Sequence, residues 1–112
     1  MGGGSPVAGR GLRVTDIQEG LMLESHIEKT VCSHARKLGW LVFKFVSPGV
    51  RGVPDRIFIK HGSLLFIEFK APKKKPNRLQ VWIHDQLESH GFPVYVIDDI
   101  DAGKELVDAH TR

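Results

Sequence analysis

Two carboxylates and one lysine stand at spacings that could support chemistry. Asp55 opens a short apolar stretch, and Glu68 and Lys70 lie two residues apart in the next one. Side chains two apart on a strand point to the same face, so Glu68 and Lys70 would share one side. Apolar residues flank them on both faces, and charges inside such a strand are costly unless they have a task.

A predicted β-hairpin brings these three residues together. Residues 56–60 and 64–70 are predicted as strands joined by a two-residue turn. If the turn is this tight, Asp55 lies directly opposite Glu68, with Cβ atoms about 4.5–5.5 Å apart. If the turn slides by one residue, Asp55 lies opposite Lys70 and diagonal to Glu68. Either register gathers all three groups.

Two carboxylates that face each other on neighbouring strands repel, which destabilises a sheet unless a cation lies between them. A divalent ion would supply this positive charge, because magnesium binds one or two carboxylates together with substrate phosphates. Lys70 could then orient or help to deprotonate an attacking water, or stabilise charge as phosphorus accepts it. The alternative is that Asp55 caps a turn while Glu68 and Lys70 form a surface ion pair. The apolar flanks favour the metal site.

The rest of the sequence predicts the elements that position these residues. Residues 1–21 are rich in glycine and are interpreted as a flexible leader of tag or vector origin, with a native disordered arm as the alternative. Residues 22–112 are predicted to form one domain. Apolar residues recur at helical spacing from Leu23 to Leu38, and Gly39 then ends the helix. Strands at 40–46, 56–60, 64–70 and 94–97 and helices at 78–90 and 102–110 complete the order α-β-β-β-α-β-α, an α/β fold with a mixed sheet flanked by helices.

The composition is that of an ordinary globular protein. Of 112 residues, 41% are hydrophobic and 26% charged, which is too apolar for a disordered chain, and the net charge of +3 permits nucleic acid as a partner. The single cysteine, Cys32, excludes an internal disulfide and is expected to be buried, and the histidine spacing disfavours structural zinc. No membrane span or signal peptide is recognisable, so we expect no membrane partner and a cytoplasmic location.

The motifs around the three residues resemble those of a known nuclease family. Residues 52–56 (GVPDR), followed after a hairpin by residues 67–72 (IEFKAP), are similar to the signature of PD-(D/E)xK nucleases. More narrowly, the chain resembles stand-alone, phage-type members of the VRR-NUC (virus-type replication-repair nuclease) family, because residues 44–49 and 73–80 also match. The resemblance covers residues 23–98, and the order and spacing of the motifs together make it specific.

This resemblance implies a restriction-endonuclease-like core and a metal-dependent endonuclease that hydrolyses phosphodiester bonds in DNA. Mg²⁺ or Mn²⁺ would be the cofactor. The metal would be held by Asp55, Glu68 and the main-chain carbonyl of Phe69, and Lys70 would be the catalytic lysine.

Two further site residues are implied by the same resemblance. The family takes a glutamate from its first helix, for which we prefer Glu28, because it lies deeper in the helix, and keep Glu24 in reserve. Gln80 matches a glutamine that opens the family's second helix and contacts the site or the substrate. On the same helix, Trp82 is expected to pack in the core, and His84 is interpreted as an ordinary surface residue.

A run of positive charge directly follows the proposed site. This run contains two prolines and no acid, so we expect a loop that lies along a phosphate backbone, with a merely solvated loop as the alternative. The predicted nucleic-acid-binding residues are Lys73, Lys74, Lys75 and Arg78 from the loop and Lys44, Arg51 and Arg56 from the other side of the site. Without a base-reading helix, recognition would rest on backbone and shape.

Free-standing members of the family resemble Holliday-junction resolvases, which act as symmetric dimers. One small domain holds one site, and paired cuts on two strands need two sites related by a two-fold axis. We therefore expect a homodimer that cuts branched DNA, in DNA repair, in the host cell cytoplasm if the protein is viral. The alternatives are a nuclease on flap, nicked or single-stranded DNA, and a non-catalytic nucleic-acid-binding module that keeps the fold.

Overall fold

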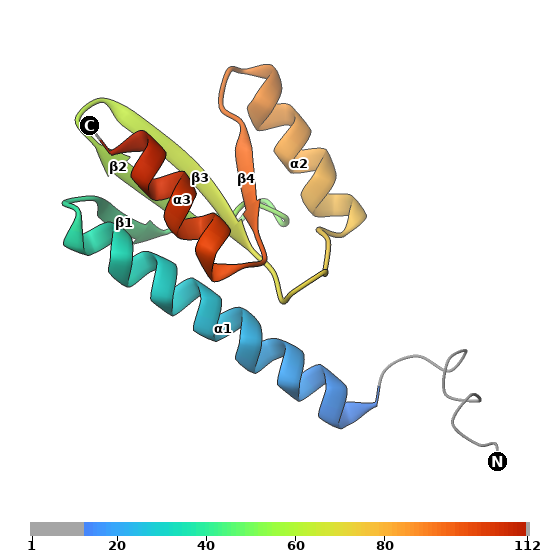
Figure 1. The fold of residues 1–112 in the computed structure, drawn as a ribbon. Coiled ribbons are helices and arrows are strands. Elements are labelled where there is room, and N and C mark those ends of the chain that lie inside the picture. The colour runs from blue at the N-terminus through green and yellow to red at the C-terminus, as the bar shows by residue number, and fades with distance from the viewer. Residues whose placement is uncertain (1–12, 112) are drawn as a thin grey trace, which may run out of the picture.

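The computed structural model describes residues 13–111, and its elements follow the predicted order (Figure 1). The helices are α1 (Val14–Lys37), α2 (Arg78–Ser89) and α3 (Ile100–His110), and the strands are β1 (Leu41–Lys44), β2 (Arg56–Lys60), β3 (Ser63–Phe69) and β4 (Val94–Ile97). The α/β class with a mixed sheet and flanking helices is confirmed. Between residues 13 and 111, no helix is long and apolar enough to cross a membrane.

The four strands lie in the order β1-β2-β3-β4, with β1, β2 and β3 antiparallel and β4 parallel to β3. A parallel neighbour needs a crossover connection, which α2 supplies. Both residues of the β2–β3 turn have positive φ, as a type I′ hairpin turn requires. Arg56 pairs with Ile67, which is the first of the two predicted registers. If this register is continued by one residue, Asp55 lies opposite Glu68.

The alternation of side chains along β3 separates the core from the site. Leu65, Ile67 and Phe69 join one buried cluster with apolar residues of α1 and α3. Glu68 points to the opposite face, where Gln80 of α2 reaches it. The helices therefore cover the sheet on two sides, with α1 and α3 over the core and α2 beside β4 (Figure 1).

Helix α1 begins earlier than predicted. It starts at Val14 rather than Leu23, so the predicted leader of residues 1–21 is wrong for its last eight residues, while residues 1–12 lie outside the described range. The glycine-rich composition suggested a linker. The structure instead has a helix there, and an ion pair between Arg13 and Asp16 stabilises its first turn. Within residues 13–111, Ile27 is the first buried residue of α1. The first half of α1 accordingly projects beyond the sheet (Figure 1).

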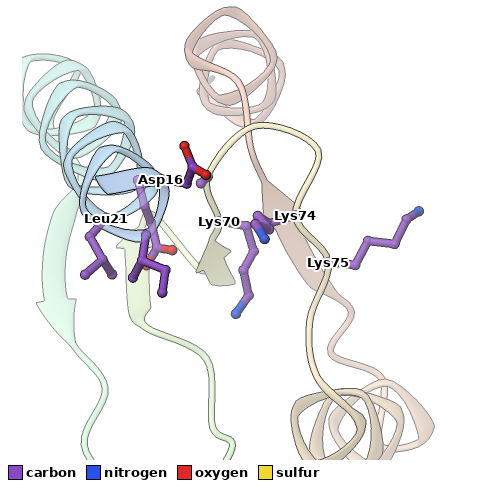
Figure 2. A pocket seen from close by; sticks show the side chains of 9 residues that line it. Asp16, Leu21, Lys70, Lys74 and Lys75 are labelled. Atoms are coloured by element: carbon purple, nitrogen blue, oxygen red, sulfur yellow. The ribbon is translucent and has the colours of Figure 1, made fainter. Parts of the chain in front are cut away.

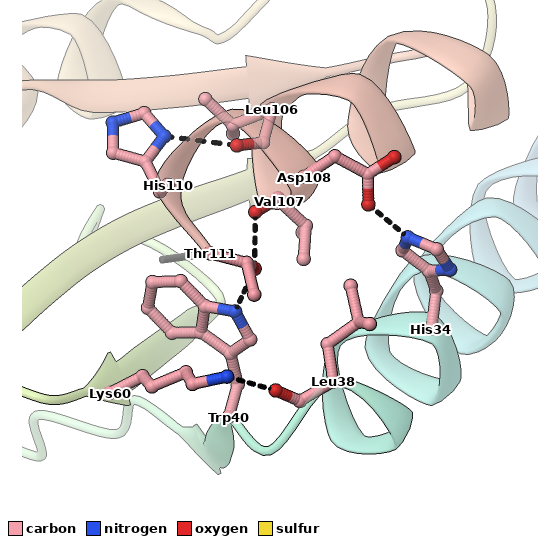
Figure 3. A network of polar contacts seen from close by, with 9 residues as sticks. All are labelled: His34, Leu38, Trp40, Lys60, Leu106, Val107, Asp108, His110 and Thr111. Atoms are coloured by element: carbon pink, nitrogen blue, oxygen red, sulfur yellow. Dashed lines mark hydrogen bonds and ion pairs between the residues drawn. The ribbon is translucent and has the colours of Figure 1, made fainter.

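The end of α3 is fixed to the start of the sheet by polar contacts (Figure 3). The indole N–H of Trp40, which is 3% exposed, donates to Thr111 Oγ1 at 2.8 Å. That hydroxyl donates in turn to the Val107 carbonyl at 2.6 Å. His34 of α1 meets Asp108 of α3 at 2.7 Å. These contacts hold α3 and α1 together over the core.

Candidate active site

Asp55 and Glu68 meet at the open end of the β2–β3 hairpin. Asp55 Oδ2 accepts a hydrogen bond from the main-chain N–H of Phe69 at 2.7 Å, which holds the carboxylate against β3. The loop before Asp55 packs against α2. The approach is so close that a Cβ added to Gly52 would lie 3.1 Å from Leu79 Cγ. Gly52 also has a φ of +91°, which favours glycine. The loop is therefore fixed between the sheet and α2.

Glu68 is 1% exposed and is surrounded by polar side chains. Its Oε2 accepts a hydrogen bond from Gln80 Nε2 at 2.8 Å and lies 3.5 Å from Lys70 Nζ. Its Oε1 lies 3.8 Å from His84 Nε2. Neither of these two atoms has a hydrogen-bond partner among the described residues. Glu68 thus keeps one buried acceptor free, next to a buried histidine.

The helix cap of α2 sets the orientation of Gln80. Asn77 and Gln80 form a reciprocal capping box, in which Asn77 Oδ1 accepts from the Gln80 N–H and Gln80 Oε1 accepts from the Asn77 N–H, both at 2.9 Å. Because Oε1 is used in the cap, Nε2 is left to donate to Glu68. One side chain therefore both starts the helix and holds the acid.

Burial raises the pKa values of the two facing carboxylates. Desolvation raises the pKa of Glu68 to about 7, the charge of Asp55 adds to this shift, and Lys70 opposes it. The pKa of Asp55 is also raised, first by burial, while the hydrogen bond from Phe69 lowers it. Both shifts arise because a buried carboxylate loses its hydration and meets a like charge. A cation placed between the two would reverse them.

The two helix glutamates have different surroundings. Glu28 Oε2 accepts a hydrogen bond from Arg56 Nε at 2.7 Å, in a half-buried ion pair. Glu24 lines a hollow together with Lys70. Burial raises the pKa of Glu24, which is lowered by the charge of Lys70 and raised by that of Asp55. Glu24 therefore shares its surroundings with Lys70, whereas Glu28 is engaged by an arginine.

The predicted basic residues lie over several hollows rather than in one groove. Lys44 and Arg56 line one hollow, residues 73–75 line a second, and Arg78 lines a third. Arg51 is exposed. The loop residues adjoin Lys70 and so remain beside the site, and Arg56 uses its Nε–H in the ion pair with Glu28.

Two residues of α2 were misjudged from the sequence. His84 is not a surface residue: it is 8% exposed, faces Glu68, and burial lowers its pKa. Its position four residues after Gln80 puts both on one helix face, a signal that the sequence already contained. Trp82 is not in the core, since it is 60% exposed. Ile83 and His84 are the buried residues of this helix instead. Cys32 is buried, as predicted.

The donor set fits a hard divalent cation. Two carboxylates face each other, and one of them has a buried oxygen without a hydrogen-bond partner within residues 13–111. Magnesium and manganese prefer such oxygen ligands and keep several waters, so they need few protein side chains. In the described part of the chain, no three His, Cys, Asp or Glu side chains form a complete metal-holding group. Glu28 Oε2 is engaged by Arg56, while the charge of Glu28 also raises the pKa of Asp55.

Comparison with known proteins finds similarity both in sequence and in structure. No family model matches the chain. A phage protein named "Putative nuclease p44", from Acyrthosiphon pisum secondary endosymbiont phage 1, is 45% identical over 87 residues, which are 77% of this chain and 94% of that protein. A solved structure described as a VRR_NUC domain matches this chain with a TM-score of 0.71 and 26% sequence identity. The match covers 78% of this chain and 96% of the chain of that structure.

Proposed function

The chain belongs to the VRR-NUC family of nucleases, and on that premise we propose that it is a divalent-metal-dependent endonuclease acting on branched DNA. The observation that carries this proposal is Glu68, which is 1% exposed, has one oxygen without a hydrogen-bond partner within residues 13–111, and has a charged neighbour, Asp55. An acid in this position destabilises the fold unless it binds something positive.

Mg²⁺ or Mn²⁺ would be held by the carboxylates of Asp55 and Glu68 and by the main-chain carbonyl of Phe69. Of the two helix glutamates, the contacts favour Glu24 as a further ligand, because Glu28 is engaged by Arg56. When bound, the divalent cation supplies Lewis-acid polarisation of the phosphate and offsets the charge of the acids.

The other side chains act on the phosphate or on Glu68. Lys70 Nζ carries a positive charge beside the acid, where it can donate a hydrogen bond to a phosphate oxygen as negative charge grows there, or orient the attacking water. Gln80 holds Glu68 Oε2 and fixes the direction of the carboxylate. Lys73, Lys74 and Lys75 follow directly and suit the neighbouring phosphates of the backbone.

The proposal that the protein cuts branched DNA implies that it acts as a homodimer. A chain of this size carries one site, and symmetric cuts on two strands of a four-way junction require two sites related by a two-fold axis. The phage origin of the 45% identical relative fits work in the cytoplasm of a host cell. Measuring the mass in solution with and without junction DNA tests the dimer: a mass of one chain in both states would contradict it.

The function is tested by cleavage of four DNA substrates: a four-way junction, a flap, a linear duplex and a single strand. Each is incubated with Mg²⁺, Mn²⁺ or a chelator. We expect paired symmetric nicks in the junction that need metal. Glu68→Gln should lower kcat by about 10²-fold or more, as expected when a charge-stabilising group is lost.

Glu88→Gln is the matched control, because it makes the same chemical change at an exposed position of α2. It should cut like the unchanged protein. Metal-dependent cutting of only flap, linear or single-stranded DNA would keep the nuclease and discard the junction. Binding without cleavage of any substrate would favour a non-catalytic nucleic-acid-binding module.

A further inference from the structure

A hollow of about 230 Å³ lies between the first half of α1 and the lysine loop (residues 70–78). The middle of its helix wall is apolar, formed by Ile17 and Leu21 with Gly20 between them, and Asp16 and Glu24 lie at the two ends. Its other wall carries the lysines: Figure 2 shows Leu21 on the helix and Lys70 and Lys74 across from it on the loop. One wall is therefore suited to an apolar surface and the other to an anion.

The apolar wall is not needed by the core. Ile17 is 46% and Leu21 is 62% exposed, and no described residue of α1 before Ile27 is buried. Gly20 leaves the floor open, since a Cβ there would meet the Cβ of Ala71 at 4.0 Å, an ordinary contact. Apolar side chains that point into a hollow and away from the core are available to a ligand.

The lysine wall is held in place by the backbone. Lys73 has a φ of +66°, unusual for a residue with a side chain, and its N–H donates to Asp98 Oδ2 at 3.0 Å. The Lys74 N–H donates to the Ala71 carbonyl at 2.9 Å. The loop thus makes a defined turn at the end of β3, and Lys74 lines the hollow from there.

The hollow adjoins the catalytic residues. Lys70 and Glu24 line it and also belong to the proposed active site. Its three lysines outnumber its two acids, Asp16 and Glu24, and Asp16 is already paired with Arg13. The hollow therefore attracts an anion, and a ligand seated in it would lie next to the phosphate that is cut.

We propose that this hollow takes one unstacked nucleotide of the DNA substrate, with its base against Ile17 and Leu21 and its phosphate on Lys74. Proteins commonly place apolar side chains against bases that leave the stack, and lysines bind the backbone phosphates. The inference rests on the proposed nuclease function and adds a substrate requirement. The nucleotide beside the cut must leave the helix, which is easiest at a branch point or in a single strand.

The test places 2-aminopurine, a base whose fluorescence rises when it unstacks, at each position around the cleavage site of the junction. The DNA is bound to Glu68→Gln protein, so that it stays intact. We expect one position to brighten on binding. Leu21→Ser should reduce that signal, and in the active protein it should lower kcat/KM about tenfold, as expected for one lost apolar contact.

Met22→Ser is the control, because Met22 is 71% exposed on the same helix but does not line the hollow. It should change neither readout. Removing the base at the responsive position of the DNA should abolish the difference between Leu21→Ser and the unchanged protein. Gly20→Leu, which fills the floor with a good helix former, should act like Leu21→Ser.

The proposal is overturned if no position brightens, or if Leu21→Ser and Met22→Ser behave alike. It is also overturned if Leu21→Ser changes the mass in solution instead, which would make the hollow a contact between two copies. Because fluorescence is read without cleavage, a subsite that fails while the protein still cuts DNA leaves the nuclease intact. Absence of cutting with an intact signal would instead contradict the nuclease.

Discussion

At the scale of single residues, Glu68 combines burial with incomplete hydrogen bonding. Gln80 satisfies one carboxylate oxygen and Lys70 lies nearby, but the second oxygen has no partner among the described residues. Asp55 adds a like charge from the facing strand. The ionised form is therefore costly in the metal-free protein, and this cost should be measurable as stability.

The first prediction concerns stability against pH. The pKa of Glu68 is about 7 in the fold against 4.5 for an unperturbed glutamate, so the fold holds the proton more tightly than the unfolded chain does. The free energy of unfolding should therefore fall as pH rises from about 4.5 to about 7, by up to about 3 kcal/mol from this group. Urea unfolding in chelator at pH 4.5 and pH 8 measures it.

Glu68→Gln should lack this loss and be the more stable protein at pH 8, whereas exposed Glu88→Gln should follow the unchanged chain. Equal pH dependence in Glu68→Gln and the unchanged protein would show that Glu68 ionises without cost.

The second prediction concerns His84. Its Nε2 lies 3.8 Å from Glu68 Oε1, which has no hydrogen-bond partner among residues 13–111, and groups that orient a metal ligand typically contribute 10–100-fold to metal affinity. His84→Ala should weaken Mn²⁺ binding by about that factor, with His84→Gln recovering part of it through its side-chain amide. Calorimetric titration measures the affinity. Unchanged binding in a folded His84→Ala protein would leave the histidine with a packing role only.

At the scale of elements, Gly103 and Gly20 differ in whether a larger side chain would fit beside them. A Cβ on Gly103 of α3 would lie 2.6 Å from Val31 Cγ2 of α1, so Gly103→Ala overpacks this contact. It should lower the free energy of unfolding by about 1–3 kcal/mol. Gly20→Ala in α1 meets Ala71 at 4.0 Å and should raise it by about 0.5–1 kcal/mol through helix propensity. Urea unfolding of both variants should give shifts of opposite sign; the same sign in both would refute this account.

The elements also explain how far sequence reasoning reached. The hairpin was predictable because its turn and its alternation are local, whereas the sequence left two registers open, of which the structure has the first. The start of α1 was missed because the glycines of residues 1–11, followed by Gly20, indicated a linker, although Val14, Ile17 and Leu21 recur at helical spacing. Glycine composition is thus weaker evidence than periodicity.

Contacts between distant elements were harder to predict. The amphipathic pattern of α2 gave its limits but not its rotation, so Trp82 was expected inside and His84 outside, the reverse of what is found. The choice between Glu24 and Glu28 depends on Arg56, whose partner lies 28 positions away in the chain. The sequence names the candidates in such cases, and only tertiary packing selects among them.

At the scale of the whole molecule, the last described residue contacts the first strand region. Trp40 is buried, and Thr111 accepts its indole N–H. Thr111→Val keeps the shape but leaves that donor unpaired, which should lower the free energy of unfolding by about 1–3 kcal/mol. Thermal or urea unfolding measures the loss. In a Trp40→Phe background, which has no N–H, the same substitution should cost far less, and an equal cost there would contradict the hydrogen bond.

The tight turn between β2 and β3 has a further consequence for the order of events during folding. A hairpin forms within about 1–10 µs, whereas α2 must complete a crossover before Gln80 and His84 reach Glu68. Asp55 and Glu68 therefore come together before Gln80 and His84 reach them. Their repulsion should then raise the free energy of the folding transition state. We expect Glu68→Gln to refold faster at pH 8 with a nearly unchanged unfolding rate, as stopped-flow kinetics would show; an effect on unfolding alone would mean that the pair meets late. The repulsion between the two carboxylates would then act as a kinetic barrier, which a divalent cation in the refolding buffer would lower.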